Sequence, residues 1–369
     1  MKVISFFLFF LHYFSIALYS QPNTLQPIVD KRVELLSIVF QLAGAPDIQE
    51  THCFQYKKDI QRHFAPYAKH RLVEYIHNTF FDSLKRDSVE YNYWIIPAIA
   101  VHLIVPPDLS KIKDSNFVDD PWDDCRYLSP QMAFMVQQFY KDADCESFFR
   151  NHEPYYKKIN DAYQEQGNLI NKEWIASFFG LTPSENYHAI VALNLKNGAY
   201  LRVNPVEGNR NTFSIFGCTG FDEEGMPTTF KEPYFKNSML HEFIHCFSNQ
   251  LIDKHSKELR PYAESILNNT KVFKLMQNTF YGNWQYLLYE SMVRACTIKY
   301  LMINEKDQAV AENEIMTQEK AGFFWIKGLV NRLNRYENNR KGYKNMESLM
   351  PEIINFFKTT ATEMQSEKE

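Results

Sequence analysis

His241-Glu242-Phe243-Ile244-His245 is the stretch of this sequence that decides the fold. Two histidines four residues apart project from one face of a helix, so both rings can reach a single metal ion. Glu242 is offset by one residue and can act as a general base toward a water at that ion. Neutral imidazoles suit Zn²⁺. The neighbouring apolar residues recur at helical spacing and predict a largely buried helix, in which polar groups need partners: they are Met239, Leu240, Phe243, Ile244, Phe247, Leu251 and Ile252.

A catalytic zinc ion needs a third protein ligand, and three acidic residues downstream are candidates. Asp253 falls at the polar end of the same helix, and Glu264 follows in a short helix that begins with a proline. Glu290 and Arg294 are the only charged residues in the apolar run 284–298, four residues apart. A carboxylate in so apolar a helix needs a compensating charge, which zinc and Arg294 would provide. We therefore expect Glu290 to be the third ligand, oriented by Arg294. Glu264 is the alternative, and a plain buried Glu–Arg pair is the interpretation without metal.

These motifs together resemble the gluzincin branch of the metallopeptidases. The resemblance rests on the segments His241–Asn249, Tyr281–Trp284 and Glu290–Ala295. More closely, the chain is similar to a family of secreted bacterial HExxH domains of unknown function with the same layout. That likeness extends upstream through Phe139–Phe149 and Phe178–Gly180. It implies a zincin-like fold and peptidase activity, and it implies no particular substrate.

Several departures narrow this resemblance. The metzincin extension would need Gly at position 248 and His at position 251, where this chain has Ser248 and Leu251. No histidine follows His255, and the Gly-x-Met-Glu-Asn signature of the gluzincin aminopeptidases is missing. Endopeptidase action is therefore expected rather than aminopeptidase action. Another side chain would have to stabilise the oxyanion; Tyr343 is our choice, with Tyr336 and Tyr281 as alternatives.

The N-terminus predicts export. Lys2 precedes a short apolar run over residues 3–18, and Ser20-Gln21 offers a small residue before the cut, as in a secretory signal peptide. The run is shorter than a membrane span of ~20 residues. No cysteine lies directly after the predicted cut, which argues against a lipoprotein anchor. Nothing later in the chain is long and apolar enough to span a bilayer. We expect residues 1–20 to be removed and the protein to be secreted or periplasmic.

Charge and cysteine content limit the partners. The formal net charge is −4 with no basic stripe, so nucleic acid and anionic membrane surfaces are poor candidates. A peptide or protein substrate is expected, and the sequence specifies no oligomeric state. The six cysteines permit disulfides in an oxidising compartment, but the sequence selects no pairing. Cys246 and Cys296, on the two helices that carry the metal motifs, are interpreted as small buried residues.

The organisation predicted from the sequence is an α+β, helix-rich fold of the zincin-like metallopeptidase type. Residues 21–170 form a mainly helical region, and residues 171–369 form the zincin-like catalytic region, in two domains or one integrated domain. An acidic, proline-bearing loop over 106–128 is expected to be solvated rather than a calcium site. A small antiparallel sheet should precede the HExxH helix. Its strands would be 187–195 and 199–203, joined as a hairpin by Asn197-Gly198, followed by a third strand at 212–216.

The function expected from these features is zinc-dependent hydrolysis of peptide bonds outside the cell. The competing class is a non-catalytic module of the same fold that binds a surface protein or a glycan. The intact Glu242 favours the enzyme, because a purely structural zinc site has no need of a general base.

Overall fold

The computed structural model describes residues 25–366 of the chain apart from short internal stretches at 46–47, 49–53, 87–90, 92–93, 114–126, 181–184, 196–197, 204, 219, 229–233, 278–281 and 305–307. The predicted signal peptide at 1–20, most of the predicted acidic loop and Tyr281 lie outside the described residues.

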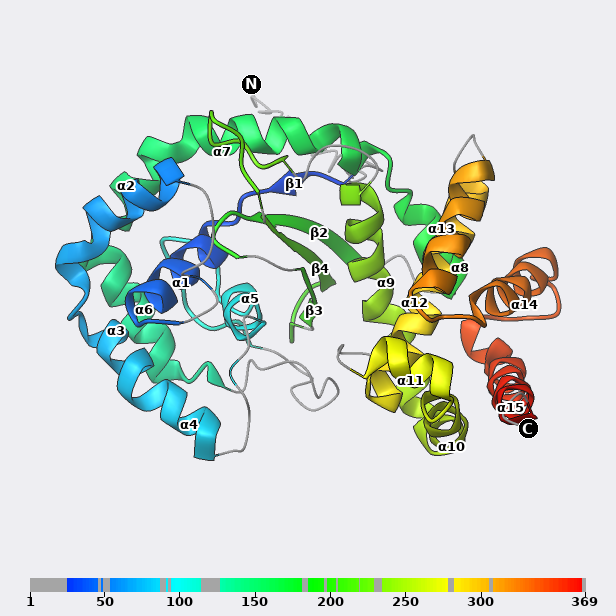
Figure 1. The fold of residues 1–369 in the computed structure, drawn as a ribbon. Coiled ribbons are helices and arrows are strands. Elements are labelled where there is room, and N and C mark those ends of the chain that lie inside the picture. Colours follow the sequence, from blue (N-terminus) through cyan, green and yellow to red (C-terminus); the bar gives the residue numbers. More distant parts are fainter. Residues whose placement is uncertain are drawn as a thin grey trace, which may run out of the picture.

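Helices dominate the described part of the chain, as predicted (Figure 1). The N-terminal half contains α1 (Lys31–Leu42), α2 (Phe54–Phe64), α3 (Arg71–Tyr75), α4 (Phe81–Arg86), α5 (Ile95–Val101), α6 (Pro130–Asp142), α7 (Cys145–Asn168) and α8 (Lys172–Phe179). The C-terminal half contains α9 (Tyr234–Lys254), α10 (Ser256–Leu267), α11 (Thr270–Met276), α12 (Trp284–Asn304), α13 (Gln308–Lys320), α14 (Ile326–Asn338) and α15 (Met350–Ser366). Helix α15 continues beyond Thr359 to Ser366, with Thr360 and Ala361 buried.

One mixed sheet lies at the centre of the described fold, with strand order β1-β2-β4-β3. Its strands are β1 (Pro27–Ile28), β2 (Glu185–Ala192), β3 (Ala199–Val203) and β4 (Arg210–Gly217). β2 pairs in parallel with β1 and with β4, and only β3 and β4 pair antiparallel. The three predicted strands therefore exist, but the predicted antiparallel sheet is wrong.

The predicted Asn197-Gly198 hairpin is also wrong, because β4 lies between the two strands that it was meant to join. The residues that follow β2 bind to α1 and do not turn back to pair with β2. The backbone N–H of Leu193 donates to Oε1 of Glu34 at 2.8 Å, and the Asn194 side chain donates to Gln41 at 2.9 Å. The two adjacent residues that signal a local turn cannot reveal these long-range contacts.

Helix α9, which carries the HExxH stretch, packs against the sheet beside β3 and β4 (Figure 1). The Ser214 hydroxyl of β4 donates to the carbonyl of Met239 at 3.1 Å. Arg202 of β3 binds α9 from the side, through the Cys246 carbonyl at 3.2 Å and the Gln250 side chain at 3.0 Å. Together with the buried Phe243 on the same helix, these contacts fix α9 on the sheet.

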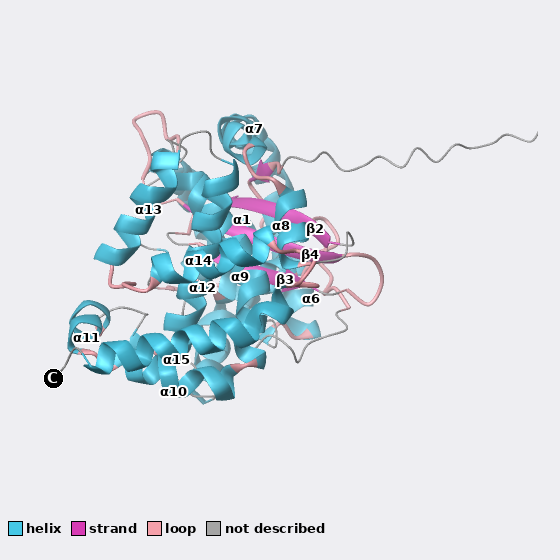
Figure 2. Cartoon of the chain, turned by 90° about the vertical axis from the view of Figure 1, so that its right-hand side faces the viewer, coloured by secondary structure: helices cyan, strands magenta, loops and turns pink. Residues whose placement is uncertain are grey.

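Helix α12 packs along α9, and most of the α12 side chains are buried. Helices α13 and α14 cover α12 from the other side, while α10 and α15 run side by side beneath them (Figure 2). A single buried core contains residues from both halves of the chain, and β1 of the N-terminal half pairs with β2 of the C-terminal half. Within the described residues, no helix combines the length and the apolarity needed to cross a membrane.

Candidate metal centre

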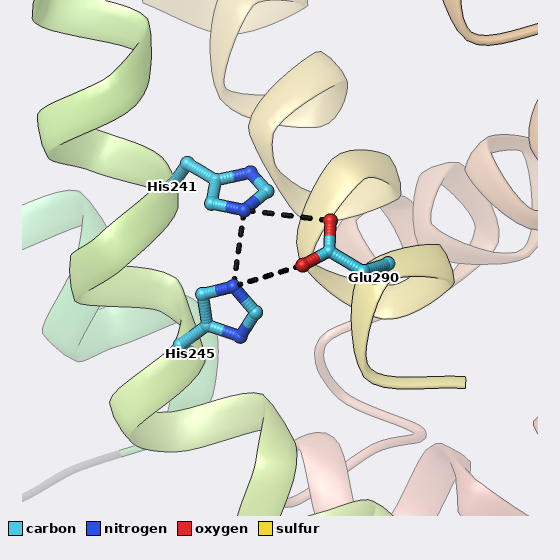
Figure 3. A group of neighbouring side chains, drawn as sticks. All are labelled: His241, His245 and Glu290. Atoms are coloured by element: carbon cyan, nitrogen blue, oxygen red, sulfur yellow. Dashed lines mark hydrogen bonds and ion pairs between the residues drawn. The ribbon is translucent and has the colours of Figure 1, made fainter. Parts of the chain in front are cut away.

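His241, His245 and Glu290 meet between α9 and α12 (Figure 3). The two Nε2 atoms of the histidines are 3.0 Å apart. Nε2 of His241 lies 3.6 Å from one carboxylate oxygen of Glu290, and Nε2 of His245 lies 3.4 Å from the other. The predicted first, second and third ligands thus lie together, although Glu290 comes from a different helix.

The three donor atoms fit a zinc ion. Zinc takes His nitrogen and carboxylate oxygen at roughly 2.0–2.2 Å in tetrahedral sites, which places neighbouring donors about 3.3 Å apart. The two imidazole nitrogens are 3.0 Å apart, and each lies 3.4–3.6 Å from its nearer oxygen of Glu290. With one ligand atom taken from each residue, all three atoms lie within 4.8 Å of one another, so small side-chain shifts would bring them to zinc-binding distances. Two imidazoles and one carboxylate are also the donor set of zinc hydrolase sites that keep a position open for water.

Arg294, the predicted partner of Glu290, contacts its carboxylate. Nε of Arg294 donates to Glu290 at 2.9 Å, and a second guanidinium nitrogen lies 2.8 Å from the same oxygen. The guanidinium also donates to Gln318 of α13 and stacks over the ring of Phe323 at 4.8 Å. Arg294 therefore fixes the direction of the carboxylate and offsets its charge.

His245 is held by two residues that the sequence analysis missed. Its Nδ1 lies 3.2 Å from Oδ1 of Asn249, and the Asn249 amide donates to the Tyr200 hydroxyl at 2.6 Å. The Tyr200 ring stacks on the imidazole with centroids 4.5 Å apart. A hydrogen bond at Nδ1 leaves Nε2 to face the cluster. Asn249 follows His245 by one helical turn and could have been noticed from that spacing, whereas Tyr200 comes from β3 and left no signal.

Burial and mutual charge set the protonation of the cluster. Burial lowers the pKa of His241 to about 4, so its ring is neutral at pH 7. Burial would raise the pKa of Glu290, but the two histidines outweigh it and hold that pKa well below its usual range. Burial opposes a charge on His245, but the Glu290 carboxylate outweighs that effect and raises the pKa of His245. A metal ion entering the cluster would displace the His245 proton and take over its pairing with Glu290.

Glu242 lies beside the cluster, in the wall of a pocket of about 490 Å³ between α9, α12 and α13. Burial raises the pKa of Glu242 to about 7. Its Oε2 atom is buried and has no hydrogen-bond partner among the described residues. A carboxylate in this position can exchange a proton with a molecule in the pocket. The pocket is lined by Asn237, Ser238, His241, Glu242, Arg294, Thr297, Glu314, Thr317 and Gln318.

The other acidic candidates make other contacts. Glu264, the alternative third ligand, accepts from Nε of Arg260 at 2.7 Å at the surface. Asp253 accepts from the Tyr289 hydroxyl and from Gln285, the latter at 2.7 Å. Neither residue belongs to the His241 cluster, which supports Glu290 over both.

The tyrosines chosen for oxyanion stabilisation also have other partners where the structure describes them. The Tyr343 hydroxyl donates to Glu352 of α15, and its ring packs on Tyr336. The Tyr336 hydroxyl donates to the carbonyl of Phe178 at 2.7 Å. Cys246 and Cys296 are buried free thiols, as are Cys145 and Cys218.

Comparison with known proteins shows the family. A model described as a domain of unknown function (DUF4932) matches residues 25–356, and the chain belongs to this family. The comparisons with curated proteins and with solved structures gave no match.

Proposed function

We propose that this member of a domain family of unknown function is a zinc-dependent peptidase that cleaves within peptide chains. The observation that carries the proposal is the convergence of three donor atoms from His241, His245 and Glu290 beside the pocket-facing carboxylate of Glu242. A structural zinc site closes its coordination with protein ligands, whereas three ligands and an adjacent base are typical of hydrolytic sites.

Zinc bound by these three residues would supply Lewis-acid activation of a water and of the scissile carbonyl. Glu242 would take the proton of the attacking water on Oε2 and then give it to the leaving nitrogen. Burial favours the first step, because it raises the pKa of the Glu242 carboxyl and so strengthens this base.

Neighbouring residues would keep these groups in place. Asn249 and Tyr200 hold the His245 ring, and Arg294 holds the Glu290 carboxylate. Gly198, directly before β3, leaves room for the Glu242 carboxylate. Such support matters because catalytic groups lose efficiency when misplaced by about 1 Å.

The pocket supports a substrate of peptide size. Its volume of about 490 Å³ falls within the usual range of ligand sites and exceeds the space that a water needs. The signal-peptide pattern in residues 1–20 supports action outside the cytoplasm, on extracellular or periplasmic protein.

The test compares the wild type with Glu242→Gln, each loaded with zinc, on a broad peptide library read by mass spectrometry. The amide keeps the shape of the side chain but cannot accept the proton, so we expect equal zinc content and a loss of turnover of at least ~100-fold. Glu264→Gln, on the surface of α10, is the matched control and should cleave like the wild type. A wild type that binds zinc but cleaves no peptide would instead support a non-catalytic module.

A further inference from the structure

The pocket beside Glu242 has an unusual lining. Helices α9, α12 and α13 each contribute residues to it, and every lining residue is polar or charged. Ligand pockets are usually lined mainly by apolar side chains. A substrate side chain that enters here therefore meets polar residues from all three helices.

Besides Oε2 of Glu242, two further oxygen atoms of its lining residues lack partners. Oγ1 of Thr297 on α12 and Oδ1 of Asn237 on α9 are buried and make no hydrogen bond within the described part of the chain. Thr297 is only 5% exposed. Buried polar atoms are nearly always paired in native proteins, so unpaired ones at a single pocket point to a polar ligand. An N–H donor can satisfy both the Asn237 amide oxygen and the Thr297 hydroxyl oxygen.

The charged residues of the pocket wall also favour a ligand that donates hydrogen bonds. The guanidinium of Arg294 is already engaged by Glu290 and Gln318. The Gln318 amide in turn donates to Glu314 at 2.5 Å. Glu314 has no ion-pair partner among the residues that the structure describes. The Glu314 carboxylate therefore offers a ligand an acceptor and a negative charge that has no counterion among the described residues.

We infer that this pocket is a specificity subsite for a substrate side chain that donates N–H hydrogen bonds, next to the scissile bond. The inference rests on the proposed function. A carboxamide (Asn, Gln) or a basic side chain (Lys, Arg) satisfies Thr297 and Asn237, and a basic one also pairs with Glu314. An apolar side chain would strand these acceptors, and an acidic one would face Glu314.

The experiment measures binding, so it does not depend on turnover. Zinc-loaded Glu242→Gln protein is used to select from a library of hexapeptides in which each position is varied. We expect one position to favour Gln, Asn, Lys or Arg over Leu, Phe and Glu by about 10-fold or more. Gln enriched alone identifies a carboxamide site, and Lys or Arg enriched as well identifies a basic one. Enrichment of apolar or acidic residues, or discrimination at no position, overturns the inference.

Variants locate the preference in this pocket. Thr297→Val keeps the shape but removes the hydroxyl, and Asn237→Ala provides a second variant on another helix. Each should lower the preference for Gln over Leu several-fold with zinc content unchanged. Thr359→Val, on the exposed side of α15, is the control. If both pocket variants select peptides like the parent, the subsite lies elsewhere. A wild type that cleaves nothing would defeat the proposed function yet leave this binding result readable.

Discussion

Gly198 and Glu242 approach so closely that any side chain at position 198 would have to displace the Glu242 carboxylate. A β carbon there would lie 2.9 Å from Oε1 of Glu242 and 3.3 Å from its carboxyl carbon. Gly198 directly precedes β3, the strand that also carries Tyr200 and Arg202 against α9. The sheet thus sets where the Glu242 carboxylate can lie.

Gly198→Ala should displace the base without touching the metal ligands. We expect turnover to fall by about 10–100-fold because a shift of about 1 Å misaligns the carboxylate. Zinc content should stay at the wild-type level. Both are measured on one preparation, by peptide cleavage and by metal analysis. Undiminished turnover in this variant would show that the Glu242 position is not critical.

Glu290→Ala should lose zinc and also destabilise the fold. Its carboxylate is the main partner of Arg294, and both side chains are largely buried, with 13% and 17% exposed. Unpairing a buried charge costs about 3–5 kcal/mol. Glu264→Ala should change little, because it breaks only a surface pair worth about 0–1 kcal/mol. Zinc content and thermal melting of both variants are compared. Loss of zinc in Glu264→Ala alone would reverse the assignment of the third ligand.

Asn249→Leu should weaken zinc binding while leaving all three ligands present. The Asn249 side chain holds Nδ1 of His245 and is itself held against Tyr200. Loss of such a supporting contact typically costs 10–100-fold in metal affinity. Competition with a chelator of known affinity measures the change, and His245→Ala gives the floor. An affinity equal to that of the wild type would mean that His245 is oriented by packing alone.

Glu34 makes the stability of the protein depend on pH. Burial raises the pKa of Glu34 to about 7, and hydrogen bonds from Leu193 and Tyr56 only partly offset this. The folded pKa lies above the ordinary value of 4.5, so the unfolded chain loses its proton first as pH rises. The free energy of unfolding should therefore fall between about pH 4.5 and 7, by about 3 kcal/mol in total, and then level off.

Glu34→Gln should remove this loss, because the amide stays neutral and its oxygen can still accept from the Leu193 N–H. Chemical denaturation at pH 5 and at pH 8 measures the difference between variant and wild type at each pH. Glu74→Gln, exposed on α3, is the control. The wild type should lose more stability than Glu34→Gln between the two pH values. An equal loss in both proteins would show that Glu34 does not titrate in this range.

The candidate metal centre was largely predictable because its signals are local. His241, His245 and Glu242 share one helix, and Glu290 stands out by its pairing with Arg294 in an apolar run. The contact between α9 and α12 could be inferred because buried polar groups need polar partners. The other residues of the site could not be predicted from the sequence. Tyr200 comes from β3 and Gly198 directly precedes it, and Thr297, Glu314 and Gln318 meet only once α13 covers α12.

The helices and three of the strands could be predicted from the sequence, but the pairing of the strands could not. The helix-rich character and three of the strands follow from hydrophobic periodicity. The order of the strands depends on contacts between distant residues, such as Glu34 with Leu193, which no local pattern contains. The two-residue β1 is too short to give a periodic signal at all.

The most direct test of the metal centre is to measure the metal content of the purified protein by elemental mass spectrometry. The wild type is compared with the double variant His241→Ala/His245→Ala. We expect about one zinc per wild-type chain and none above background in the double variant, because one imidazole donor pair supplies two of three ligands. Stoichiometric zinc in the double variant, or a wild type that takes up no zinc at saturating concentration, would contradict the assignment of this cluster as a metal centre.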